Sequence, residues 1–178
     1  MSREYDAIVY DLDGTLVRLA VDWDRVAREV DAALGARGVD TGERGLWAML
    51  DLATETGHRA LVEDVIGEHE REGARTAERL PLADELPHEV PTGVVSLNCE
   101  AACRIALEVH GLDGHLGTVI GRDSVATYKP APEPLLAAAK ALGADPERTL
   151  FVGDSASDAT AAERAGIDFA WARERLES

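Results

Sequence analysis

The sequence predicts an α/β fold in which a parallel sheet is covered by helices on both faces. Three observations support this fold class. Short apolar runs alternate with stretches of helical period over much of the chain. The predicted strands are almost continuously apolar, which is typical of parallel strands that are buried on both faces. Polar residues follow directly after several of these strands, which is where ligands bind in such sheets.

A helical insertion is expected after the first strand, which the apolar run at residues 7–10 predicts. Apolar residues then recur at helical spacing in three stretches, which are closed in turn by Gly38, Gly57 and Pro81. The third helix runs into a charged tail at residues 68–79, which we interpret as a solvated helix face. The whole insertion is therefore expected to be helical.

The remainder of the chain alternates strand and helix. Strands are expected at 93–97, 117–120, 149–152 and 169–172, and helices at 102–109, 132–142 and 156–165. Glycines stand where these helices end, and two prolines open the second of them. This order predicts a Rossmann-like core made of residues 1–17 and 81–178, with residues 18–80 inserted into it.

The composition is that of a globular protein with one domain and a sizeable insertion. The chain has 178 residues, of which 29% are charged and 46% are hydrophobic. No apolar run approaches the ~18 residues of a membrane span, and the first residues lack the apolar segment of a secretory signal. We therefore expect no membrane contact and a cytoplasmic location. Cys99 and Cys103 lack a metal or redox spacing and are expected to be small core residues.

The charge balance excludes nucleic acid as a partner. The net charge is −16, with 34 acidic residues against 18 basic ones, whereas nucleic-acid binding needs a cationic surface. Only Lys129 and Lys140 are lysines. An acidic, lysine-poor surface suggests a halophilic-like protein, whose self-repulsion is screened and whose stability rises as the KCl concentration rises. In such a chain, any site for a phosphate group must be locally cationic.

The segment Asp11-Leu-Asp-Gly-Thr-Leu-Val17 places two carboxylates directly after the first strand. Carboxylate oxygens bind hard divalent cations, and an aspartate beside such a cation can attack phosphorus because the metal offsets the repulsion between anions. Gly14 suits a tight turn, and Thr15 offers a hydroxyl and an amide N–H to a phosphate oxygen. Plain turns also carry this pattern. A calcium loop needs a different spacing around its glycine and is disfavoured.

Polar residues of matching chemistry stand at the ends of other predicted strands. Ser96 and Asn98 end the second strand, Asp154 and Asp158 follow the fourth, and Lys129 lies in a loop that leads into a helix. Because the carboxyl ends of parallel strands meet at one edge of a sheet, these side chains are expected to converge. An ammonium and a divalent cation there would nearly balance a carboxylate and a dianionic phosphoryl group.

In order and spacing, these segments resemble the haloacid dehalogenase superfamily of phosphohydrolases. The resemblance covers the full chain and rests on four blocks: Asp11–Val17, Val95-Ser96, Lys129-Pro130 and Gly153–Asp158. The helical insertion resembles the small helical cap of the phosphoglycolate phosphatase-like branch. The resemblance implies a Mg²⁺-dependent phosphatase that acts on a small phosphorylated metabolite.

The resemblance also implies catalytic and metal-binding roles. Asp11 would be the nucleophile that forms an aspartyl-phosphate, and Asp13 would protonate the leaving alcohol and then activate water. Asp11, Asp154 and the backbone carbonyl of Asp13 would hold Mg²⁺. Asp158 would bind the metal or orient its ligands.

Four residues are expected to contact the phosphate. The resemblance implies that Thr15 and Ser96 grip phosphate oxygens and that Lys129 holds both the phosphate and Asp11. Lys129 stands out in a chain that nearly always uses arginine, since a compact ammonium fits where a guanidinium would crowd the phosphoryl group. Asn98 is a candidate for substrate binding, or alternatively for capping the helix that follows.

Other functions and residues stay open. A phosphomutase similar to β-phosphoglucomutase would share the aspartyl-phosphate, and a non-catalytic binding protein could use the same fold. Dehalogenases resemble the pattern without the second aspartate, which is present here as Asp13.

Ser155 and Ser157 are either helix caps or ligands, and the five histidines are expected to be structural or on the surface. For Trp23 and Arg18 we favour core packing and a surface charge over contact with the substrate. The substrate could be phosphoglycolate, a sugar phosphate or a nucleotide, and the oligomeric state is open.

Overall fold

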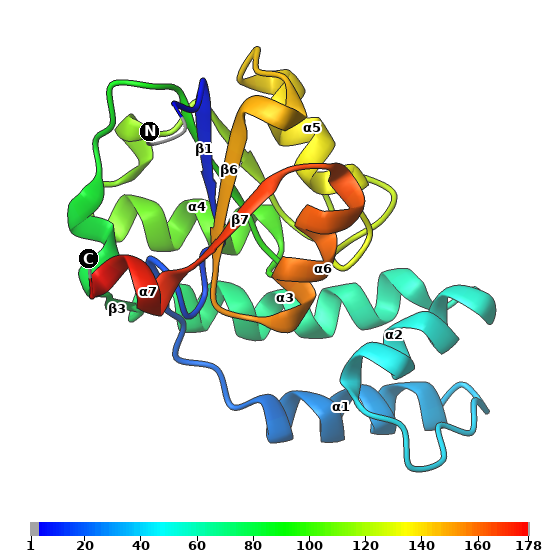
Figure 1. Ribbon diagram of the computed structural model, residues 1–178. Coiled ribbons are helices and arrows are strands. Elements are labelled where there is room, and N and C mark those ends of the chain that lie inside the picture. Colours follow the sequence, from blue (N-terminus) through cyan, green and yellow to red (C-terminus); the bar gives the residue numbers. More distant parts are fainter. Residues whose placement is uncertain (1–3, 178) are drawn as a thin grey trace.

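The computed structural model describes residues 4–177, and its centre is a five-stranded parallel sheet. The strands are β1 (Ala7–Tyr10), β4 (Thr92–Val95), β5 (Thr118–Ile120), β6 (Thr149–Gly153) and β7 (Asp168–Trp171). They lie in the order β5-β4-β1-β6-β7, and every neighbouring pair is parallel (Figure 1). All carboxyl ends therefore meet at one edge of the sheet, and the predicted fold class is confirmed.

Helices cover both faces of the sheet. These helices are α4 (Glu100–Val109), α5 (Glu133–Ala141) and α6 (Ala156–Ala165). Successive strand residues point to opposite faces, so Tyr10 packs in the apolar cluster that includes α4, whereas Val9 packs in the cluster that includes α5 and α6. Both side chains are fully buried. Burial on both faces is the physical reason why β1 is continuously apolar.

The segment between β1 and β4 forms a second helical part with its own apolar core. Its helices are α1 (Trp23–Gly35), α2 (Leu46–Glu55) and α3 (Arg59–Arg75). Val30, Leu50 and Ile66, one from each helix, are fully buried in a shared cluster. Figure 1 shows α3 between the sheet and α1, with the helical part facing the carboxyl edge of the sheet.

The expectation of an all-helical insertion is wrong at both ends of this segment. β2 (Val17–Arg18) and β3 (Glu78–Arg79) pair antiparallel where the chain leaves the sheet and returns to it. The third helix also ends at Arg75 instead of running to residue 79. Two backbone segments that run side by side satisfy their amide and carbonyl groups by pairing, and this long-range contact overrides the local helical pattern. The division into a core and a cap at residues 18–80 stays a proposal.

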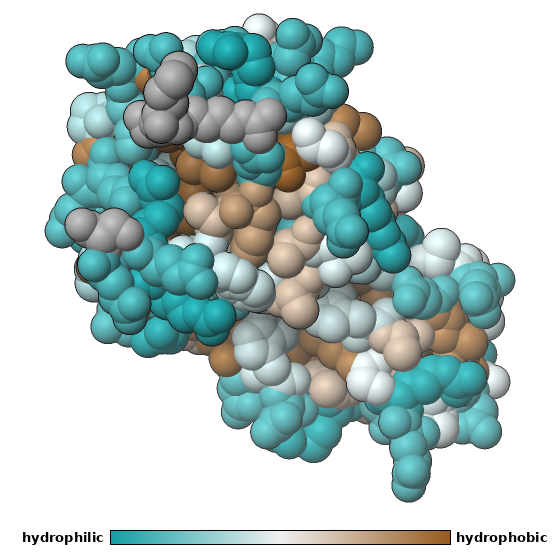
Figure 2. Space-filling view, viewed as in Figure 1, coloured by the Kyte–Doolittle hydropathy of each residue, from teal (hydrophilic) through white to brown (hydrophobic). Residues whose placement is uncertain are grey.

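Short turns complete the fold. They are the 3-10 turns η1 (Pro81–Glu85), η2 (Asp113–His115) and η3 (Pro146–Arg148), and the short helix α7 (Ala172–Leu176). In the view of Figure 2, hydrophilic side chains cover the periphery, and paler or apolar residues gather where the sheet-bearing and helical parts meet. Within residues 4–177, no helix has the length and hydrophobicity needed to cross a membrane.

Candidate active site

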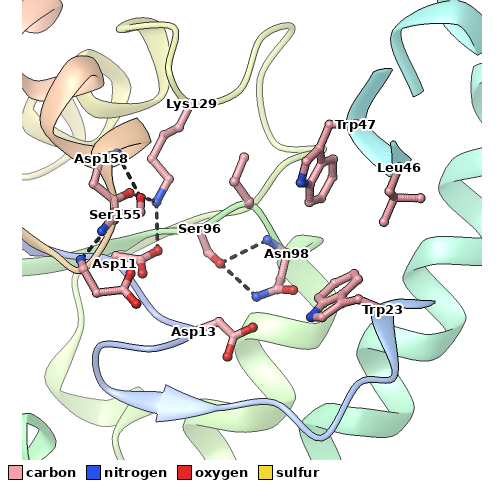
Figure 3. Close-up of a pocket in the computed structure, with 12 residues that line it drawn as sticks. Asp11, Asp13, Trp23, Leu46, Trp47, Ser96, Asn98, Lys129, Ser155 and Asp158 are labelled. Atoms are coloured by element: carbon pink, nitrogen blue, oxygen red, sulfur yellow. Dashed lines mark hydrogen bonds and ion pairs between the residues drawn. The ribbon is translucent and has the colours of Figure 1, made fainter. Parts of the chain in front are cut away.

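A cavity of about 310 Å³ lies between the carboxyl edge of the sheet and the first turns of α1 and α2. A cavity of this size suits a small molecule. It contains every predicted site residue except Thr15 (Figure 3). Its lining residues are Asp11, Asp13, Trp23, Leu46, Trp47, Ser96, Leu97, Asn98, Lys129, Asp154, Ser155 and Asp158.

The ammonium of Lys129 joins three of the predicted segments. It donates hydrogen bonds to Asp11 Oδ1 at 2.8 Å, to Asp158 Oδ1 at 2.6 Å and to the Val95 carbonyl oxygen at 3.1 Å. The Lys129 residue is buried. Burial acts to lower the pKa of Lys129, but the carboxylates of Asp11 and Asp158 outweigh this and raise the pKa. Lys129 is therefore a charged group held against Asp11.

Asp158 shapes the loop that follows β6. Its Oδ2 atom accepts hydrogen bonds from the amides of Ser155 at 3.1 Å and Asp154 at 3.2 Å. The Ser155 hydroxyl accepts in return from the Asp158 amide at 3.1 Å, which completes a capping box at the start of α6. Ser155 is thus a helix cap that also lines the cavity. This arrangement fixes the loop from which Asp154 reaches the cavity.

The turn after β1 presents its two carboxylates differently. Asp11 is buried, and the Thr15 hydroxyl donates to its Oδ2 atom at 3.1 Å. The Thr15 amide bonds to the Leu12 carbonyl at 3.1 Å, so Thr15 holds Asp11 and the turn while lying outside the cavity lining. Asp13 is half-buried and lines the cavity, and its Oδ1 atom accepts from the Leu19 amide at 2.9 Å.

Gly14 lets the loop after β6 approach this turn closely. Its φ of 87° lies in the left-handed region that favours glycine. A Cβ atom at this position would lie 2.2 Å from Asp154 Oδ2. The close approach brings three carboxylates together, and carboxylate oxygens of Asp11, Asp154 and Asp158 all lie within 4.8 Å of one another.

Ser96 and Asn98 occupy the loop after β4 and contact each other. The Ser96 hydroxyl oxygen accepts from the Asn98 amide at 3.1 Å and from Asn98 Nδ2 at 3.3 Å. The first amides of the following helical turn donate instead to the carboxylates of Glu70 and Asp123, at 2.9 Å and 2.8 Å. The alternative that Asn98 caps α4 is therefore wrong, because acceptors from other segments cap this helix.

The carboxylates that line the site outnumber its one cationic side chain, Lys129. Burial raises the pKa values of Asp11, Asp13 and Asp154 above the ordinary aspartate range. At Asp11 the Lys129 ammonium opposes this rise, whereas the neighbouring Asp158 and Asp154 add to it. A divalent cation would offset the repulsion among these oxygens, and hard oxygen donors are the ligands that Mg²⁺ prefers. The donor set therefore fits such an ion.

Aromatic and apolar side chains form the opposite wall of the cavity, which sequence reasoning missed in part. Leu46 and Trp47 come from the first turn of α2, and Trp23 begins α1. Trp23 does pack against the core of the helical part, as expected, but it also lines the cavity. Arg18 is a surface charge, as expected, with an ion pair to Glu78 at 3.3 Å.

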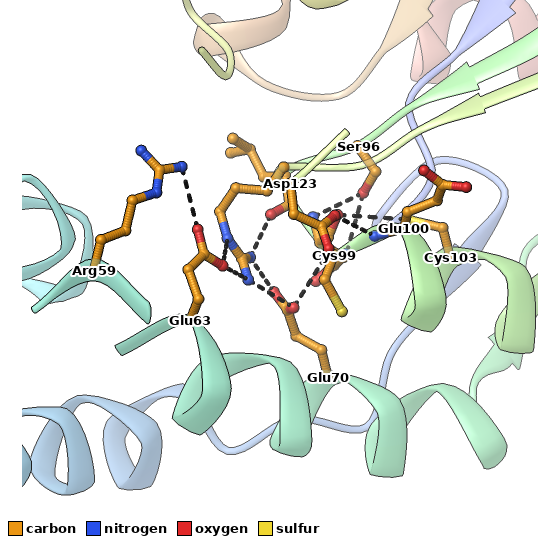
Figure 4. A network of polar contacts seen from close by, with 11 residues as sticks. Arg59, Glu63, Glu70, Ser96, Cys99, Glu100, Cys103 and Asp123 are labelled. Carbon is orange, nitrogen blue, oxygen red and sulfur yellow. Dashed lines mark hydrogen bonds and ion pairs between the residues drawn. The ribbon is translucent and has the colours of Figure 1, made fainter. Parts of the chain in front are cut away.

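A buried arginine joins the sheet to the helical part. Arg122, in the loop after β5, is 0% exposed and donates to Glu70 Oε1 at 2.6 Å and to the Leu97 carbonyl at 2.7 Å. Its guanidinium also pairs with Glu63 Oε2 at 2.8 Å. Figure 4 shows Glu63 and Glu70 projecting from α3, with Cys99 beside Glu70. The Cys99 amide donates to Glu70, so this network holds the loop that carries Ser96 against α3.

Glu70 corrects the expectation that residues 68–79 form a solvated helix face. It is 0% exposed and ion-paired, although the surrounding charged residues do face solvent. The sequence did contain a signal for the burial of Glu70, since this residue continues the spacing of the buried Val62 and Ile66 along α3. Arg122 carried no such signal, because its partners on α3 lie more than fifty residues earlier in the chain.

The remaining candidates have structural roles. Cys99 and Cys103 are buried free thiols, as predicted. His69 contacts Glu29 at 2.6 Å, and the ring of His88 lies 2.8 Å from the Tyr10 hydroxyl. None of the five histidines lies among the cavity-lining residues, all of which belong to the described part of the chain.

Comparison with known proteins identifies the family of the chain. The family described as haloacid dehalogenase-like hydrolase matches residues 58–172. The phosphoglycolate phosphatase of Aquifex aeolicus is 30% identical over 93% of this chain and 83% of its own length. That of Salmonella paratyphi A is 34% identical over 89% of this chain and 77% of its own length.

Solved structures share the fold. A HAD-superfamily hydrolase of subfamily IA from Geobacter sulfurreducens has a TM-score of 0.63 at 23% identity, and the match covers 97% of this chain and 98% of that one. A hydrolase from Pseudomonas syringae has a TM-score of 0.67 at 24% identity, over 92% and 83%. The chain therefore belongs to the haloacid dehalogenase-like hydrolases, and it is a phosphatase of their phosphoglycolate phosphatase-like branch.

Proposed function

We propose that this phosphatase is Mg²⁺-dependent and hydrolyses a small phosphorylated metabolite through an aspartyl-phosphate on Asp11. The observation that supports this most is the meeting of three distant segments at one point. The Lys129 ammonium lies 2.8 Å from Asp11 Oδ1, and oxygens of Asp11, Asp154 and Asp158 lie within 4.8 Å of one another. Phosphoryl transfer depends on such positioning and on neutralisation of charge.

The carboxyl groups of Asp11 and Asp13 can carry out both steps of the hydrolysis. In the first step, an Oδ atom of Asp11 attacks phosphorus and the bond from phosphorus to the leaving oxygen breaks. Asp13 gives its proton to that oxygen, and the alcohol departs. In the second step, Asp13 takes a proton from a water molecule whose oxygen attacks phosphorus, and the bond between Asp11 and phosphorus breaks to release inorganic phosphate. The raised pKa of Asp13, caused mainly by burial, favours its protonated form at the start.

The metal and the phosphate would be shared among the remaining site residues. Asp11, Asp154 and the backbone carbonyl of Asp13 would hold Mg²⁺, which when bound supplies the charge that offsets repulsion between Asp11 and the phosphoryl group. Asp158 would fix the loop of Asp154 and orient Lys129, consistent with its hydrogen bonds to both.

Three side chains would contact the phosphate oxygens. Ser96, Asn98 and Lys129 line the cavity beside Asp11 and carry donors. Thr15 would act indirectly, because its hydroxyl donates a hydrogen bond that holds Asp11 in place. Residues 18–80 would form a cap that shields the reaction from water and selects the leaving group.

Phosphate release from p-nitrophenyl phosphate tests this proposal. We expect turnover with MgCl₂, loss of turnover in EDTA, and recovery when excess Mg²⁺ is restored. Inorganic phosphate that appears in step with the loss of a sugar phosphate supports hydrolysis. Isomerised sugar phosphate without release would indicate the phosphomutase alternative. Full activity in EDTA would contradict the proposed role of the metal.

Gly14→Ala is expected to lower kcat/KM for p-nitrophenyl phosphate by at least about tenfold, because the new Cβ displaces Asp154 from the site. The Cβ would lie 2.2 Å from Asp154 Oδ2 in a left-handed backbone conformation. Kinetics at a series of Mg²⁺ concentrations measure the effect, and we expect a higher Mg²⁺ requirement.

Gly111→Ala is the matched control for this substitution. Gly111 also has a left-handed φ, of 65°, but nothing lies within 4 Å of a Cβ built there. Both variants should lose about 1–2 kcal/mol of stability to backbone strain, and only Gly14→Ala should lose activity. Equal kinetics in the two variants would show that the approach of Asp154 to the turn is unimportant.

A further inference from the structure

The wall of the cavity that faces the catalytic carboxylates is aromatic and apolar. Figure 3 shows Trp23, Leu46 and Trp47 across the cavity from Asp11 and Lys129. The rings of Trp23 and Trp47 have centroids 6.3 Å apart and planes inclined by 48°. The leaving group of a phosphomonoester bound at Asp11 would therefore meet these indole rings.

Cations in and around the cavity already have anionic partners. Lys129 is the one cation among the lining residues, and its three hydrogen bonds are to Asp11, Asp158 and Val95. Arg122 lies against Trp47, with 5.7 Å between the guanidinium carbon and the ring centroid, but it is fully buried and paired with glutamates. A carboxylate or second phosphate on the leaving group would thus be desolvated near four aspartates, with no unpaired cationic side chain among the lining residues to receive it.

Trp47 in the aromatic wall contacts Tyr128 and Arg122 as well as Trp23. Tyr128 packs beside Trp47, with centroids 6.3 Å apart, and its hydroxyl donates to Asp51 at 2.5 Å. Arg122 contacts Trp47 from within the protein. Among residues 4–177, the indole N–H groups of Trp23 and Trp47 donate to no protein atom, so they can serve a neutral acceptor on a ligand. Because Trp47 packs against these side chains, a flat group can bind on its ring at low entropic cost.

We propose that the preferred substrates are phosphomonoesters whose leaving group is uncharged and presents the apolar face of a ring. This inference rests on the proposed phosphatase function and specifies its substrate class. The ring stacks on Trp23 and Trp47, and the phosphoryl group reaches Asp11 and Lys129. The cavity of about 310 Å³ has room for a single ring beside the phosphoryl group. Phosphoglycolate, whose leaving group carries a carboxylate, is then a poor substrate.

Two matched pairs of substrates test the charge requirement. Benzyl phosphate is compared with 4-carboxybenzyl phosphate, and 2-hydroxyethyl phosphate is compared with phosphoglycolate, each with Mg²⁺. In each pair the leaving group differs in one carboxylate. We expect kcat/KM to be at least about tenfold higher for the uncharged member, because the carboxylate is left unpaired. Equal values, or a preference for the carboxylates, would overturn the inference.

Substitutions in the wall test the ring contact. Trp47→Leu is expected to lower the ratio of kcat/KM for benzyl phosphate over methyl phosphate by about tenfold, which corresponds to the loss of an aromatic stacking contact. Trp171→Leu is the control, because Trp171 lies outside the cavity lining. An unchanged ratio in Trp47→Leu, with folding verified by its thermal unfolding curve, would contradict the stacking.

Leu46→Arg supplies the missing cation. This variant is expected to raise kcat/KM for 4-carboxybenzyl phosphate about tenfold relative to benzyl phosphate, since the carboxylate gains a partner. No change in this relative rate would argue against the charge explanation. Failure of the proposed function is distinguishable from failure of this inference: in the first case no phosphomonoester is hydrolysed, and in the second hydrolysis persists without the selectivity.

Discussion

Asp11→Asn is expected to lower phosphate release from p-nitrophenyl phosphate by at least about a thousandfold, because an amide cannot act as the nucleophile. The substitution keeps the shape of the side chain. Lys129 would retain its hydrogen bonds to Asp158 and to the Val95 carbonyl, so the site is expected to keep its structure. Initial rates with saturating Mg²⁺ measure the effect, and thermal unfolding verifies the fold.

Asp113→Asn provides the matched control for this variant. Asp113 is exposed and lies in η2, ahead of β5 and therefore away from the carboxyl edge of the sheet. The Asp113→Asn variant should have the same activity as the unmodified chain. If Asp11→Asn and Asp113→Asn turn over substrate at the same rate, Asp11 is not the nucleophile and the proposed mechanism fails.

Arg122→Leu is expected to lower the free energy of unfolding by about 3–5 kcal/mol, because it leaves a buried carboxylate without its partner. Arg122 and Glu70 both have 0% exposed side chains, and within residues 4–177 no other cationic side chain forms an ion pair with Glu70. Urea unfolding followed by circular dichroism measures the change. The double variant Arg122→Leu/Glu70→Leu should recover part of the loss, since it removes both charges.

The exposed ion pair between Arg148 and Asp6 serves as the control for the buried pair. Arg148 contacts Asp6 at 2.5 Å, but the two side chains are 52% and 50% exposed. Arg148→Leu is therefore expected to change the free energy of unfolding by less than about 1 kcal/mol. A similar small change in Arg122→Leu would show that the buried network contributes little to stability.

The fold and the convergence of the site residues could be predicted because both depend on local signals. A buried parallel strand is mostly apolar, as β1 and β6 are, and its carboxyl end must lie at the shared edge of the sheet. Asp11 and Asp154 follow these two adjacent strands directly, so their proximity follows from topology. Lys129 was assigned from the Lys129-Pro130 block of the family resemblance, and its rarity in an arginine-rich chain supported that assignment.

The rest depends on contacts that no local pattern records. The antiparallel pair β2 and β3 joins segments about sixty residues apart, and each strand has only two residues. Arg122 is charged like most surface residues, and its burial depends on two glutamates that only the fold brings to it. Leu46 has the helical spacing of a core residue, and its place in the cavity depends on how α2 is oriented. The expectations of a halophilic-like character and of a cytoplasmic location stay predictions.

The central position of β1 has a consequence for synthesis on the ribosome. β1 is made before both of its partners, β4 and β6, and β6 is completed only at Gly153. Lys129 and the second acidic loop, which carries Asp154 and Asp158, also come later in the chain than Asp11, and that loop is made only after β6. On the proposed mechanism, a nascent polypeptide is therefore expected to be catalytically silent until residues 153–158 have been made, and stops before that point should yield products without hydrolytic activity.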